Sequence, residues 1–297
     1  MDFLMEEYNF NTTNFFCSDD CYTEFVSNCD EVDTYLAECE ANYQEAATQI
    51  VLDGGSNIRQ RLQYLNEQAD EKESKGIKAI IEKFKQFVDN VIAKIKEFFT
   101  KNKVKEAAKI VGSDPELGKT KIDMPDPKAF EKYIKLRNKA VDNVINKLHK
   151  KRMRVTAEEF DDMVETEFAK VEKIRRTLWS VGVGVMCERV ATSLGQLIGT
   201  ISISKKVMND YADRVTQYNT KEYVSLYTHD AMRVNTLATG AGLGAGISAG
   251  VVVNKLMKKQ AETVNIQNEY VMRACREINK TALKRRAMSA PNGTYIF

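Results

Sequence analysis

The chain contains no proline between residues 128 and 290. Proline removes a backbone donor and clashes with the preceding helical turn, so a stretch this long without proline is open to long helices. The content of Lys, Glu, Ala and Gln also favours helix, and 29% of the 297 residues are charged. We therefore expect an all-α protein, an elongated helical bundle with long helices and almost no sheet.

Residues 234–253 carry no charge and contain five glycines. A helix of this length spans about 30 Å. Each glycine costs about 1 kcal/mol relative to Ala inside a helix, so close packing must offset the loss. Glycines four residues apart let a second helix approach backbone to backbone. We predict a helix-packing face made of Gly242, Gly246 and Gly250, with Gly240 and Gly244 beside it.

A second apolar tract, residues 177–203, is interrupted only by Glu188 and Arg189. We expect the tracts 177–203 and 234–253 to form a Gly/Ala-rich helical hairpin. The tracts hold mostly Gly, Ala, Ser, Thr and Val, so their insertion into a bilayer would be marginal. Two interpretations stay open: an interior pair of helices in a bundle, or a hairpin that enters a membrane conditionally.

Residues 76–104 form the clearest amphipathic pattern. Ile77, Phe84, Val91 and Phe98 repeat every seven residues, and lysines dominate the opposite face. We expect this apolar face to supply contacts to a partner. A basic amphipathic helix either packs its apolar face in a helical bundle or lies on an anionic membrane.

A basic cluster ends the next expected helix. It consists of Lys147, Lys150, Lys151, Arg152 and Arg154. Such side chains are candidate contacts for the phosphates of DNA or lipid. They also complement the carbonyl end of a helix, so both interpretations remain.

Charge is distributed unevenly along the chain. Residues 1–58 hold thirteen Asp or Glu and no Lys or Arg, so the remainder carries a net charge of +15. This acidic start, expected as two or three short helices, is typical of an interaction arm or of a segment that docks on its own basic body. Five parts are expected: an acidic, aromatic-rich segment (1–70), a basic amphipathic helix (71–112), a proline-rich linker (113–127), a long-helix bundle (128–285) and an irregular tail (286–297).

No motif points to a reaction. The run GSDPELGKT, residues 112–120, has five residues between its glycines where a phosphate-binding loop has four. Glu158, Asp162 and Glu165 share a helical face, but carboxylates at a helix start also stabilise the helix dipole. Cys17, Cys21, Cys29 and Cys39 lack the paired spacing of a zinc site. We expect no catalytic residue, metal, cofactor or small-molecule substrate, and thus no enzyme.

The run GIKAIIEKFKQFVDNVIAKIKEFFTKNK, with the acidic, aromatic start and the Gly/Ala tract, resembles internal virion proteins of large tailed bacteriophages. The resemblance implies a non-enzymatic structural protein of the virion, assembled in the host cytoplasm and placed inside the head or near the portal. It implies contacts with other virion proteins, with further copies of the chain, with DNA or with the host membrane during genome delivery. The alternative is a membrane-inserting effector or pore-forming protein that uses the 177–253 hairpin.

Overall fold

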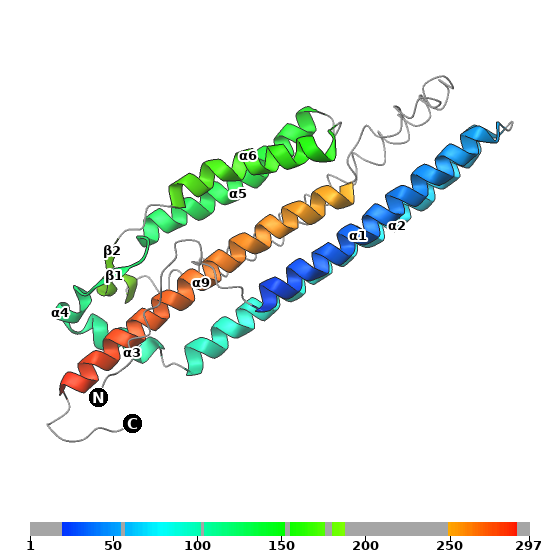
Figure 1. Cartoon of the computed structure of the whole chain (residues 1–297). Coiled ribbons are helices and arrows are strands. Elements are labelled where there is room, and N and C mark those ends of the chain that lie inside the picture. The colour runs from blue at the N-terminus through cyan, green and yellow to red at the C-terminus, as the bar shows by residue number, and fades with distance from the viewer. Residues whose placement is uncertain are drawn as a thin grey trace, which may run out of the picture.

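The computed structural model describes residues 20–54, 57–101, 104–151, 155–175, 180–187 and 249–289. In this part the protein is all-α, apart from two strands of three residues each. The long helices pack side by side in roughly one direction and give the body an elongated shape, in which two helical hairpins flank a central helix (Figure 1).

The first hairpin consists of α1 (Asp20–Leu52) and α2 (Ile58–Lys101). The turn between them includes Gly54 at a φ of 59°, in the left-handed region that favours glycine. The side chain of Asp53 accepts hydrogen bonds from Gln49 and Arg61 on either side of this turn. The hairpin is therefore closed by its own turn residues.

The expectation of two or three short helices in the acidic start is wrong from residue 20 onward, because α1 is a single helix of 33 residues. Its apolar residues pack continuously along α2, and Phe25 lies 5.8 Å from Phe84 and 5.2 Å from Phe87 between ring centroids. The second helix begins at Ile58 and continues without a break across the boundary placed at residue 70. Long-range packing thus sets the length of both helices.

The proline-rich segment 113–127 is folded against the core. It follows α3 (Val104–Gly112) and contains α4 (Pro115–Gly118) and β1 (Lys121–Asp123), after which Met124 is fully buried. Asp114 caps α4 by accepting hydrogen bonds from the backbone of Glu116 and Leu117. This segment therefore connects the two hairpins through ordered structure.

The second hairpin consists of α5 (Pro127–Lys150) and α6 (Ala157–Arg175). Asp126 caps α5, whose first residue is a proline, and Thr156 accepts a hydrogen bond from the backbone of Glu159 at the start of α6. Both starts follow the capping signals in the sequence.

The first described residues of the tract 177–203 form a strand. Residues Ser180–Gly182 form β2, which pairs antiparallel with β1. A Cβ on Gly184 would lie 3.0 Å from the Cα of Gly118, which is tighter than most Cβ contacts, so the two backbones approach each other closely at these glycines. The expectation of a continuous helix through residue 180 is wrong, and helix resumes at residues 183–187.

The central element is α9 (Ala249–Ser289), which packs against α1, α2, α3 and α5 and lies between the two hairpins in Figure 1. Much of the rest of the predicted Gly/Ala hairpin, residues 188–248, lies outside the described residues. Among the described helices, none is both long and apolar enough to cross a membrane.

Candidate functional site

A buried arginine interrupts the apolar face of α5. Arg137 follows Ile134 and precedes Val141 at helical spacing, and only 1% of its surface is exposed. A guanidinium buried in this way is costly unless carboxylates and hydrogen-bond acceptors surround it. The groups that contact Arg137 therefore define a charged site inside the apolar core.

The first partners come from the hairpin that contains Arg137. Its Nη1 lies 2.5 Å from Glu172 Oε1 on α6, and the hydroxyl of Tyr133 donates to the same carboxylate at 2.8 Å. The guanidinium carbon also lies 5.1 Å from the ring centroid of Phe168. Arg137 thus joins α5 to α6 through charge and through an aromatic face.

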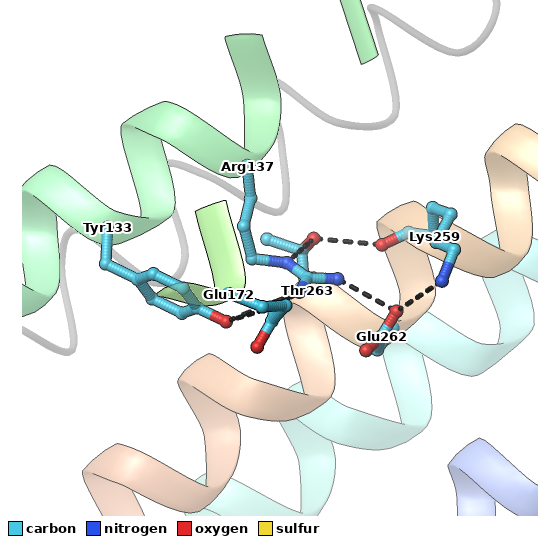
Figure 2. A network of polar contacts seen from close by, with 6 residues as sticks. All are labelled: Tyr133, Arg137, Glu172, Lys259, Glu262 and Thr263. Carbon is cyan, nitrogen blue, oxygen red and sulfur yellow. Dashed lines mark hydrogen bonds and ion pairs between the residues drawn. The ribbon is translucent and has the colours of Figure 1, made fainter. Parts of the chain in front are cut away.

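The remaining partners come from α9. Arg137 Nε donates to Thr263 Oγ1 at 3.0 Å, and Nη2 lies 2.9 Å from Glu262 Oε2. Lys259 lies 3.4 Å from the same oxygen of Glu262. Figure 2 shows the guanidinium between Glu172 on one side and Glu262 and Thr263 on the other. We call these six residues the Arg137 network: Tyr133, Arg137, Glu172, Lys259, Glu262 and Thr263.

The charges in the Arg137 network stabilise one another. Burial lowers the pKa of Arg137, but Glu262, Tyr133 and Glu172 outweigh burial and raise it overall. Burial raises the pKa of Glu262, but Arg137 and Lys259 outweigh it and lower that pKa. Burial raises the pKa of Tyr133 to about 12. The guanidinium of Arg137 and the carboxylate of Glu262 therefore stay charged at neutral pH, as a structural ion-pair network requires.

Further polar contacts attach α9 to both hairpins. Lys258 Nζ lies 2.8 Å from Asp30 Oδ1 and 2.7 Å from Asp33 Oδ2, both on α1. Asn254 donates from Nδ2 to the carbonyl oxygen of Cys29 at 2.8 Å. Lys255 pairs with Asp161 on α6. Together with the Arg137 network, these contacts connect α9 to α1, α5 and α6.

Of the five predicted packing glycines, only Gly250 lies in the described part of the chain. It is buried near the start of α9, where an added Cβ would lie 2.7 Å from Leu36 Cδ1. A Cβ on Gly76 of α2 would lie 3.0 Å from Leu36 Cδ2. Leu36 of α1 therefore fills the space that glycines leave on two neighbouring helices. Gly240, Gly242, Gly244 and Gly246 lie outside the described residues.

The apolar face expected to contact a partner lies inside the chain's own bundle. Ile77, Phe84 and Val91 are buried, and Phe98 packs against the same core. These residues are on α2, which packs against both α1 and α9. The face therefore contacts helices of the same molecule.

The basic cluster at the end of α5 is mostly paired where it is described. Lys147 lies 2.8 Å from Glu167, and Lys151 lies 3.4 Å from Glu159. Hydrogen bonds from Lys147 and Lys170 lower the pKa of Glu167 to about 2. Lys150 is exposed, whereas Arg152 and Arg154 lie outside the described residues. Two of the candidate phosphate contacts are thus engaged with α6.

The carboxylates and cysteines considered as candidate metal ligands lie on different helices in the described part of the chain. Glu158, Asp162 and Glu165 are exposed on α6, and no three His, Cys, Asp or Glu side chains converge on a metal-sized site in the described part of the chain. Cys21 and Cys29 are buried in α1 and form no disulfide in the described part of the chain, and burial raises the pKa of Cys29 to about 12.

Sequence reasoning missed the Arg137 network. The sequence does contain one indication of this network: Arg137 occupies a position on the apolar face of α5 where the helical pattern predicts an apolar residue. The matching carboxylates are 35 and 125 residues away along the chain, so the pairing itself had no local signature.

No family model, curated protein or solved structure matches this chain.

Proposed function

We propose that this chain is a non-enzymatic structural protein of a bacteriophage virion, internal to the head or near the portal. It acts through helix–helix assembly and takes part in genome delivery. The observation that carries the proposal is the way α9 is held: ion pairs and hydrogen bonds attach it to helices of both hairpins. Such cross-linking favours a stiff, elongated building block.

The sequence of α2 supports the same proposal. The run from residue 76 to residue 103 carries the resemblance to internal virion proteins, and its apolar residues build the core of the first hairpin. Lysines occupy much of the outer face of this helix. A basic surface of this kind suits a position beside packaged DNA.

The glycine face is proposed to continue the packing of Gly250. Gly246 and Gly242 precede it by four and eight residues, so in a continuous helix they lie along the same face. Contact between Leu36 and Gly250 supports close helix packing at the end of this face. We infer that the tract 234–253 forms part of a Gly/Ala-rich helical hairpin that packs against protein.

Mass spectrometry of density-purified phage particles tests the proposal. The chain should copurify with the particles at a fixed copy number and remain after the removal of surface-bound protein. Its absence from particles, while it is present in the infected cell, would contradict a structural role in the virion.

The membrane-inserting alternative has its own test. Flotation of the purified chain with anionic liposomes should leave it in the soluble fraction if the glycine face packs against protein. Flotation of the wild type, lost in a Gly246→Leu variant, would favour an effector or pore-forming protein instead.

A further inference from the structure

One face of α1 carries a glutamate every seven residues. These four side chains are exposed, and no ion pair in the described part of the chain involves them. The positions three residues after each one hold small or short side chains, which are also exposed. We call this surface the acidic face; it consists of Glu24, Ser27, Glu31, Thr34, Glu38, Ala41, Glu45 and Thr48. Its charges repeat about every 10 Å along the helix.

The outer face of α5 carries the opposite charge with the same repeat. Lys128 and Lys135 are seven residues apart, as are Lys132 and Lys139, and all four are exposed. We call this surface the basic face. Lys135 pairs with Glu131 of its own helix at 2.7 Å. The other three lysines form no ion pair in the described residues.

The neighbouring helix α6 carries both basic and acidic exposed side chains. The contact between Arg137 and Glu172 places the middle of α5 beside the end of α6, because the two helices run antiparallel. The end of α6 exposes Lys173, and also Lys170, which pairs with Glu167 at 2.6 Å. The exposed carboxylates of α6, from Glu158 to Glu165, lie at the other end of this hairpin, as the pairing of Lys151 with Glu159 indicates. These carboxylates of α6 therefore do not neutralise the basic face.

The two faces of one molecule do not meet. In Figure 1, α1 and α5 lie on opposite sides of α9. The inner sides of both helices are committed to the core, through Phe25 and Cys29 on α1 and through Val141 and Val144 on α5. The charged faces consequently point outward in different directions, and a contact between them has to join two molecules.

We propose that copies of this chain associate head to tail, with the acidic face of one copy on the basic face of the next. Opposite charge and a shared seven-residue repeat allow several ion pairs to form in one register. When two copies associate in this way, the acidic face of one copy and the basic face of the other remain unoccupied. Further copies bind to these faces, so the association extends into a ring or a filament. This inference rests on the proposed function and names its partner, which is a second copy of the chain.

Sedimentation velocity of the full chain over a range of concentrations tests the association. At low salt the wild type should associate reversibly, and at about 1 M salt it should be monomeric, because the Debye length then falls to about 3 Å. An acidic-face variant, E24K/E31K/E38K, and a basic-face variant, K128E/K132E/K139E, should each associate more than about tenfold more weakly. Lys135 is left in place because it pairs with Glu131.

A mixture of the two variants tests whether the acidic face and the basic face bind each other. The new lysines on α1 of one variant face the new glutamates on α5 of the other, so an equal mixture should associate as the wild type does. Variant E158K/D162K/E165K has the same charge change on exposed positions of α6 and should leave the association intact. Circular dichroism checks that all variants keep their helices.

Three results would overturn the inference: a wild type that stays monomeric at low salt at every concentration, a mixture that associates no better than its components, or a monomeric chain whose basic face binds duplex DNA. A chain found in phage particles but monomeric would contradict this inference alone. Association of a chain that is absent from particles would contradict the proposed function alone.

Discussion

Leu36 lies between glycines of two other helices, and this single side chain brings α1, α2 and α9 close together. An added Cβ would meet its side chain at 2.7 Å from Gly250 and at 3.0 Å from Gly76. Leu36 is buried, so it has little room to move away from either side. Glycine is costly in a helix, and here the close contact of three helices offsets that cost.

Substitution of Gly250 by leucine should destabilise the protein by about 1–3 kcal/mol, because the new side chain overpacks the site against Leu36. Urea denaturation followed by circular dichroism measures the change. The double variant Leu36→Ala/Gly250→Leu should recover part of the loss, since space is returned on α1. Gly112→Leu is the matched control, because nothing lies within 4 Å of an added Cβ there. Equal stability of Gly250→Leu and the wild type would contradict the close contact.

Substitution of Arg137 by alanine should cost about 3 kcal/mol, because it leaves Glu172 and Glu262 without their shared cation. Lys139→Ala, on the exposed side of the same helix, should change stability by less than about 0.5 kcal/mol. Simultaneous replacement of Arg137 by Met and of both glutamates by Gln should recover most of the loss. If the single and the triple variants are equally destabilised, packing rather than charge is what Arg137 provides.

At the scale of elements, α9 is unusual because its buried surface is partly polar. Asn254, Gln260 and Thr263 are each at most 2% exposed, and lysines of the same helix reach carboxylates of α1 and α6. A helix of this composition gains little from apolar burial on its polar side. Its position depends on partners supplied by the two hairpins.

The contact between α5 and α6 should make stability depend on pH. The pKa of Glu167 is lowered from 4.5 to about 2 by hydrogen bonds from Lys147 and Lys170. A lowered pKa contributes stability above the unfolded value, and this contribution is lost as the pH falls from about 4.5 toward about 2. Glu167→Gln should therefore be less stable than the wild type at pH 7, by about 1–2 kcal/mol because both lysines are partly exposed.

Urea denaturation at a series of pH values measures this dependence. The stability curves of the wild type and Glu167→Gln should converge as the pH approaches 2. Glu165→Gln, on the exposed side of α6, serves as the control and should follow the wild type throughout. Curves of Glu167→Gln and wild type that stay parallel down to pH 2 would contradict the role given to Glu167.

The sequence predicts those elements whose signals are local. The starts of α5 and α6 follow from Asp126–Pro127 and from Thr156, and the apolar face of α2 follows from its seven-residue repeat. The strand β2 was missed because its partner, β1, lies about sixty residues away. The burial of α9 was missed for the same reason: its polar residues resemble a solvent-exposed face until Asp33, Asp161 and Arg137 are placed beside them.

In the whole molecule, the acidic residues of α1 lie on different sides of the helix. Asp30 and Asp33 of α1 are turned toward Lys258 and attach the first hairpin to α9. The glutamates of the acidic face are exposed on another side of the same helix, and the proposed association uses them. Of the two alternatives left open by the sequence, the segment that docks on its own body is thus supported by the contacts of Lys258, and the arm for partners stays a prediction.

Helix α9 contacts both hairpins of the same molecule. Carbodiimide cross-linking tests this arrangement most directly, because this reagent joins only amines and carboxylates that are already in contact. An equal mixture of isotopically light and heavy chains, analysed by mass spectrometry, separates links within a molecule from links between molecules. We expect links within one molecule from Lys258 to Asp30 or Asp33 and from Lys255 to Asp161. Absence of these links, or their appearance only between light and heavy chains, would contradict this arrangement.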